Sequence, residues 1–111
     1  MNVTEMQQGA VTVLKPDGPL VGVAAEDFGL RMREVASESL GRLVLDASGV
    51  PLLDSKGLEA LEDVSDEMAD SGHVLKLCGA NETLRQVLEL TGLSGKFEYY
   101  DDMNSAVRSF S

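Results

Sequence analysis

Four short apolar runs recur along this chain and predict its β-strands. The runs are residues 10–14 (AVTVL), 43–47 (LVLDA), 74–78 (VLKLC) and 97–100 (FEYY). A Pro- and Gly-containing turn is predicted at 15–19, and residues 3–7 are expected to pair with the first run as a hairpin. The runs at 43–47 and 74–78 do not alternate with polar residues, which is typical of strands covered on both faces.

The segments between these runs show helical spacing of their apolar positions. Helices are predicted over residues 26–40, 55–71 and 81–91, with a short last helix from Asn104. Asn81 is a suitable N-cap, and Gly41, Gly72 and Gly92 follow the predicted helix ends. Strands that alternate with helices predict right-handed crossovers and a largely parallel sheet with an antiparallel edge. The predicted class is therefore α/β or α+β.

Length and composition are those of one domain covering residues 1–111, since the chain is 43% hydrophobic and 25% charged. The formal net charge of −10 disfavours binding to nucleic acid or to an anionic membrane. No apolar run approaches the ~18 residues that a membrane span needs, and no secretory signal is evident. We therefore expect a cytoplasmic protein without membrane insertion, in which the single Cys78 belongs to the core.

The predicted helix 55–71 is strongly amphipathic. At ~100° per residue its apolar residues share one side and its acids the other. The acidic side carries Glu59, Glu62, Asp63, Asp66, Glu67 and Asp70. Residues 54–70, which include Asp54 before the helix, hold more than half of the excess negative charge of the chain. Two interpretations stay open: a solvated face that keeps the protein soluble, or a recognition surface for a basic partner.

The start of that helix, LLDSKG, concentrates the candidate chemistry. Asp54 or Ser55 is expected to cap the helix, because either side-chain oxygen can accept a hydrogen bond from a free N–H of the first turn. Lys56 places a positive charge where the helix dipole disfavours it, at a cost of ~0.3–1 kcal/mol. Either Lys56 pairs with Glu59 or Glu62, or it contacts a partner or a phosphate on Ser55.

Three segments resemble the STAS domain of anti-sigma factor antagonists: VLDASGVPLLDSKGLEAL, HVLKLCGA and VLELTGLSGKFEYYDDMNSAV. The resemblance extends over essentially the whole chain. It implies a STAS-type fold, in which a four- to five-stranded, mostly parallel sheet packs against about four helices. It also implies that the loop and helix around residue 54 dock on an anti-sigma factor that is a switch-type serine kinase, and that phosphorylation of this junction releases the partner.

Carried over residue by residue, the resemblance assigns partner binding to one stretch of the chain. Its residues are Asp54, Ser55, Lys56, Gly57, Leu58, Glu59 and Glu62. The chain departs from the family pattern at two positions. Lys56 stands where the family has its phosphoaccepting Ser or Thr, which leaves Ser55 as the candidate phosphorylation site, and Val21 stands where an Asp is frequent.

An enzymatic function is not expected. The chain has neither a phosphate-binding Gly-rich loop nor spaced metal ligands, and its one His, His73, resembles a turn residue. We expect no cofactor and no metal. As an alternative, small STAS proteins also resemble a cytosolic accessory subunit of lipid-trafficking ABC transporters, and the partner would then be the ATPase subunit.

Overall fold

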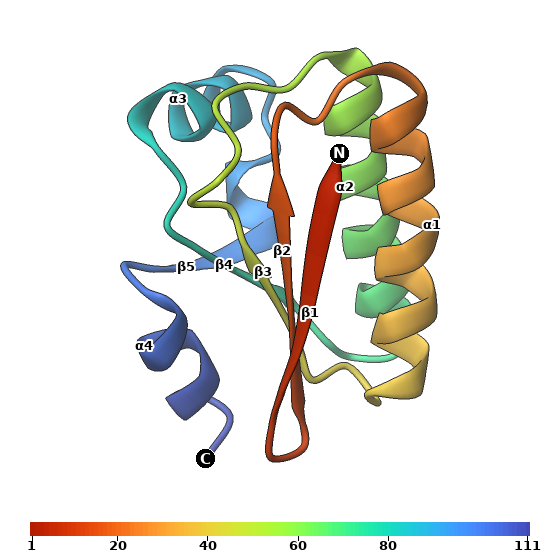
Figure 1. Cartoon of the computed structure of the whole chain (residues 1–111), viewed down its shortest axis with the longest axis vertical. Coiled ribbons are helices and arrows are strands. Elements are labelled where there is room, and N and C mark those ends of the chain that lie inside the picture. Colours follow the sequence, from red (N-terminus) through yellow and green to blue (C-terminus); the bar gives the residue numbers. More distant parts are fainter.

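A five-stranded sheet forms the centre of the computed structural model, which describes all 111 residues (Figure 1). Its strands, which follow one another in chain order, are β1 (Asn2–Gln8), β2 (Val11–Asp17), β3 (Leu43–Asp46), β4 (Leu75–Cys78) and β5 (Phe97–Tyr100). β1 pairs antiparallel with β2, and all other neighbours are parallel. The predicted α/β class, the N-terminal hairpin and the antiparallel edge are thereby confirmed.

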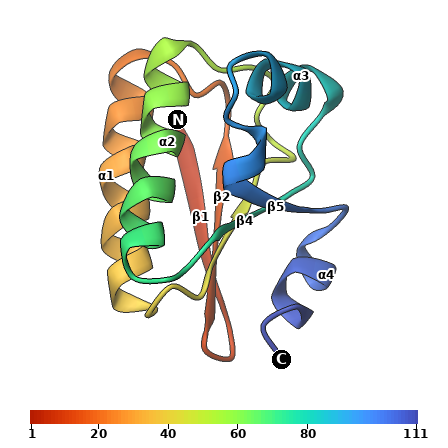
Figure 2. The same ribbon diagram turned by 180° about the vertical axis from the view of Figure 1, so that it is seen from behind.

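Four α-helices cover the sheet unequally. They are α1 (Gly22–Glu38), α2 (Ser55–Asp70), α3 (Glu82–Leu90) and α4 (Met103–Arg108), and a single 3-10 turn at Ser94–Lys96 precedes β5. The first three helices pack on one face of the sheet, whereas α4 lies on the other (Figures 1 and 2). None of the helices has the length and apolar character that crossing a membrane requires.

The alternation of side chains along the strands divides the interior into two apolar clusters. Leu43 and Leu45 of β3 point into the large cluster under α1, α2 and α3, whereas Val44 points into a smaller one under α4. All four residues of β3 and all four of β4 are buried, as the continuous apolar runs predicted. Cys78 belongs to the smaller cluster and is 1% exposed, which confirms its assignment to the core.

Two predicted boundaries are wrong. β2 continues to Asp17, so residues 15–17 of the predicted turn are strand. Pro16 is tolerated there because pairing with β3 ends at Leu14 and the strand continues with β1 alone. α1 begins at Gly22, four residues before the predicted start at Glu26. The side chain of Asp54, in the loop before α2, accepts a hydrogen bond from the N–H of Gly22.

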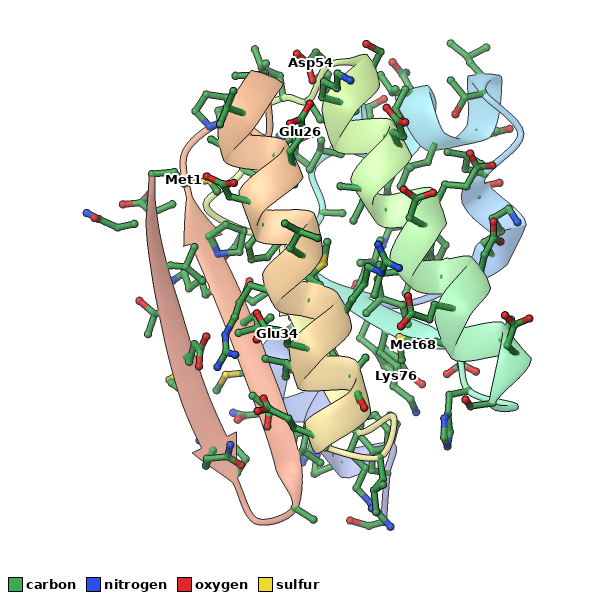
Figure 3. All side chains as sticks on the ribbon, turned by 90° about the vertical axis from the view of Figure 1, so that its right-hand side faces the viewer. Met1, Glu26, Glu34, Asp54, Met68 and Lys76 are labelled. Atoms are coloured by element: carbon green, nitrogen blue, oxygen red, sulfur yellow. The ribbon has the colours of Figure 1, made fainter.

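α1 and α2 lie side by side, and the packing of α1 against α2 holds the N-terminal end of α2 in place (Figure 3). They approach closely at Gly29, where an added Cβ would lie 2.9 Å from the Cβ of Ala60. An ion pair between Arg33 and Glu67 links the two helices further along. The orientation of α2 is therefore set by α1 as well as by the sheet.

Candidate functional site

The carboxylate of Asp54 organises the junction between β3 and α2. Its Oδ1 accepts hydrogen bonds from the backbone N–H groups of Lys56 at 2.9 Å and Gly57 at 3.0 Å. Of the two caps predicted for α2, the structure uses Asp54. These donors, the N–H of Gly57 first, lower the pKa of Asp54 because they stabilise the charged carboxylate.

The second oxygen of Asp54 reaches a different helix. Its Oδ2 accepts from the backbone N–H of Gly22, the first residue of α1, at 3.0 Å. Val21 occupies the N-cap position of α1 and makes no side-chain capping bond. A residue more than thirty positions away thus supplies what the local sequence lacks, which explains why α1 begins before its predicted start.

Backbone hydrogen bonds hold the two loops at this edge together. The N–H of Leu20 donates to the carbonyl of Leu52 at 3.1 Å, and the N–H of Asp54 donates to the carbonyl of Leu20 at 3.2 Å. Gly57 sits directly on this contact, since an added Cβ would lie 2.4 Å from the Leu20 carbonyl oxygen and 2.8 Å from the Cβ of Leu53. The glycine of the junction is therefore required by close packing.

Lys56 bridges the two helices on the outside of the junction. Its Nζ lies 3.3 Å from Oε1 of Glu26 on α1 and 3.8 Å from Oε2 of Glu59 on α2. The predicted pairing with Glu59 is confirmed, whereas Glu62 makes no ion pair with Lys56. Glu26, which the sequence analysis did not identify, is the main reason that the pKa of Lys56 is raised, followed by Glu59. These acids offset the unfavourable position of the lysine in the first helical turn.

A groove of about 280 Å³ lies beside Lys56, between α1 and α2. Gly29 and Ala60 are among its lining residues, and the others are Glu26, Leu30, Arg33, Lys56, Glu59 and Asp63. Figure 3 shows Glu26 near the start of α1 and Asp54 at the start of α2, on neighbouring helix ends. The groove is thus lined mainly by charged side chains of both signs.

Two exposed apolar side chains flank the junction. Val23, in the first turn of α1, is 69% exposed, and Leu52, in the loop before Asp54, is 49% exposed. Neither was singled out from the sequence, although Leu52 lies in a loop outside any helical or strand periodicity. Of the predicted partner-binding residues, Ser55 is exposed, whereas Gly57 is buried and Leu58 packs partly against the core. The exposed part of the junction, here called the tip, comprises Val23, Leu52 and residues 54–56. It therefore includes more apolar surface than the sequence indicated.

The acidic side of α2 is partly neutralised by bases from other elements. Lys56 pairs with Glu59, Arg33 of α1 with Glu67, and Lys96 with Asp66, the last at 2.8 Å. The three remaining acids of this side make no ion pair: Glu62, Asp63 and Asp70. No group of three or more His, Cys, Asp or Glu side chains is arranged to hold a metal ion.

The fold and this junction match a known family of α/β domains. The family model for the STAS domain matches residues 3–106, and the chain belongs to the STAS domain family. A search of curated proteins finds no match to it.

Solved structures with the same fold come from different kinds of protein. A Thermotoga maritima protein suggested to be an anti-sigma factor antagonist has a TM-score of 0.86 at 23% identity, covering 96% of this chain and 92% of that one. The phosphorylated Bacillus cell fate determinant SpoIIAA has a TM-score of 0.76 at 15% identity, covering 99% and 100%. The mouse anion transporter Slc26a9 has a TM-score of 0.73 at 20% identity over 94% of this chain, but only 18% of the transporter.

Gly57→Ala is expected to destabilise the protein by about 3 kcal/mol, because the new methyl group would collide with a backbone carbonyl that cannot move cheaply. Gly95→Ala is the matched control, since nothing lies within 4 Å of a Cβ at that position. Urea unfolding of both variants measures the difference. Equal stability of the two would contradict the close packing described for Gly57.

The capping role of Asp54 predicts a specific pH dependence. Its pKa is lowered from 3.8 in the folded protein, so its stabilising effect is complete above that value and is lost as the pH falls through the folded pKa. The difference in unfolding free energy between wild type and Asp54→Ala should therefore shrink in acid. Ser55→Ala, which removes no titratable group, should show a constant difference, and a similar constancy for Asp54→Ala would refute the assignment.

Proposed function

We propose that this protein is a non-catalytic, cytosolic regulatory module that acts as an anti-sigma factor antagonist. In this proposal the segment Asp54–Gly57 and the following acidic helix dock on an anti-sigma factor. The observation that carries it is the pair of exposed apolar side chains, Val23 and Leu52, held on a rigid frame beside Asp54. An apolar centre with a charged rim is the usual anatomy of a specific protein interface.

The polar groups of the junction favour binding over catalysis. Asp54 already accepts three backbone hydrogen bonds, and Lys56 is held by two carboxylates. Neither is placed as a general base beside a nucleophile, which acid–base or covalent catalysis would require. What the junction offers to another molecule is a preorganised surface.

The unpaired negative charges of α2 indicate what kind of surface the partner presents. Glu62, Asp63 and Asp70 are free of ion pairs, so they remain available to basic side chains of another protein. Complementary charges of this kind raise the association rate and reject like-charged partners. We therefore expect the docking surface of the anti-sigma factor to be basic.

Lys56 sets the regulation apart from that of the family. An amine held between Glu26 and Glu59 replaces the usual phosphoaccepting hydroxyl. We propose that docking is not released by the usual phosphorylation. Ser55 is the one hydroxyl left at the tip, exposed at the first position of α2, where free N–H groups and the helix dipole tolerate a phosphate.

The alternative partner is the ATPase subunit of a lipid-trafficking ABC transporter. The likeness of this chain to part of an anion transporter favours keeping transport as a second class of function. The same junction would then dock on a nucleotide-binding subunit. Direct binding to purified candidates of each class decides between the two.

Docking through the tip predicts that Leu52→Asp weakens binding to a purified anti-sigma factor by about tenfold or more, because a charge would be buried in the apolar centre. Leu90→Asp is the control, since Leu90 is 86% exposed on α3. Calorimetric titration measures both. Full affinity of Leu52→Asp would contradict the proposed surface, and binding to the ATPase subunit alone would favour the alternative.

The proposed regulation predicts that Lys56→Ser restores release of the partner on incubation with the switch kinase and ATP, whereas the wild-type complex persists. Modified residues are located by mass spectrometry, with Ser55→Ala as the companion variant. Phosphate incorporated by wild type should lie on Ser55. Release of the wild-type complex on phosphorylation at any position would refute the proposal that phosphorylation does not release the partner.

A further inference from the structure

Lys76 is an unusual residue for its position in the fold. It lies in the middle of β4, a strand whose four residues are all buried, and its side chain is only 10% exposed. Leu75 and Leu77 on either side point into the large cluster under α1 to α3. Lys76 therefore points to the opposite face of the sheet, which is the face that α4 covers.

The Lys76 ammonium contacts two residues of β5 and two residues that follow α4. Nζ donates to Oγ of Ser109 at 2.6 Å and lies 3.5 Å from Oε1 of Glu98. It also lies 4.2 Å from the centre of the Phe110 ring and 5.5 Å from that of Tyr100. These are favourable cation–π distances.

The contact with Ser109 closes the end of α4. The Ser109 hydroxyl accepts from Lys76 and donates to the carbonyl of Ala106 at 2.6 Å, so that the lysine is linked to the last turn of the helix. Asp102 caps the other end by accepting from the N–H of Ser105. Each end of this six-residue helix is thus held by a single polar side chain.

The segment 101–111, here called the C-terminal cover, shields a separate apolar surface. Under it lie Val11, Val13, Val44 and Cys78, which form a cluster distinct from the main core. Helices of six residues are not stable alone in water. α4 consequently persists through its docking on this face, away from α1, α2 and α3 (Figure 2), and the large cluster contains no residue of the cover.

The lysine changes the balance between the docked and undocked cover. Docking withdraws the ammonium from water, which is costly and is only partly offset by the two contacts that the cover itself supplies, the Ser109 hydroxyl and the Phe110 ring. Undocking returns the ammonium to water on the side that the cover had shielded, while Glu98 and Tyr100 of β5 stay beside it. A wholly apolar side chain would gain nothing from that exposure, so Lys76 favours release of the cover in comparison with an apolar residue.

We propose that the C-terminal cover releases from the sheet as a unit while the rest of the domain stays folded, and that Lys76 sets how readily it does so. Release exposes the apolar strip of β2 and β3 on the face opposite α1 and α2. This sub-global opening is a conformational device separate from the junction at Asp54.

Cys78 reports the opening, because it is the only cysteine and is 1% exposed beneath the cover. Burial raises the pKa of its thiol to about 12, so the docked form is unreactive toward iodoacetamide. The labelling rate is measured on the full chain in increasing urea below the unfolding transition. We expect a rate that hardly changes with urea at first, the mark of a small opening. A rate that follows the slope of global unfolding from zero urea would overturn the proposal.

Two variants test the role of Lys76 directly. Lys76→Met keeps length and contacts with the rings but removes the charge, and should slow labelling about tenfold, which equals ~1.4 kcal/mol of opening free energy. Phe110→Ala should accelerate labelling to a similar extent, whereas Leu90→Ala, at an exposed position of α3 on the other face of the sheet, should leave it unchanged. Labelling of Lys76→Met as fast as wild type would refute the role of the lysine. Should Lys76→Met fail to fold, the urea dependence of the wild-type chain decides the proposal.

Discussion

The candidate site depends on a single carboxylate that binds the N-terminal N–H groups of two helices at once. Asp54 caps α2 through Lys56 and Gly57, and its second oxygen holds the start of α1 at Gly22. Because each oxygen is used, neither helix can shift along its axis without losing a charge-assisted hydrogen bond. The exposed tip is thereby fixed relative to the sheet, and this preorganisation lowers the entropy that docking would cost.

The same carboxylate explains where prediction from the sequence succeeded and failed. The cap of α2 was predictable because Asp54 and the N–H groups that it binds are neighbours in the chain. The start of α1 was not, since its N-cap residue is Val21 and its capping oxygen belongs to a distant loop. The strands were predictable for a similar reason, because a short apolar run is a local property of the sequence. The pairing of Lys56 with Glu26 depends on how two helices pack, which local pattern does not specify.

Lys76 illustrates a second limit of prediction from the sequence. The run VLKLC predicted a buried strand correctly, and the strand alternation places Lys76 and Cys78 on one face. What the sequence could not indicate is that residues near the C-terminus surround the ammonium with a hydroxyl, a carboxylate and two rings. A polar residue in an otherwise apolar strand signals a partner elsewhere in the chain, because an unpaired buried charge is too costly to persist. The identity of that partner emerges only from the fold.

Charge and apolar contact have separate places on the proposed docking surface, and this separation has a kinetic consequence. Val23 and Leu52 lie at the tip, whereas the unpaired acids Glu62, Asp63 and Asp70 extend along α2. Exposed charges act at a distance and influence mainly the association rate, while buried apolar anchors govern how long a complex lasts. The internal ion pairs of α2 reduce the free charge without removing it. A surface built in this way favours fast selection of a basic partner, and leaves the lifetime of the complex to the small apolar area beside Asp54.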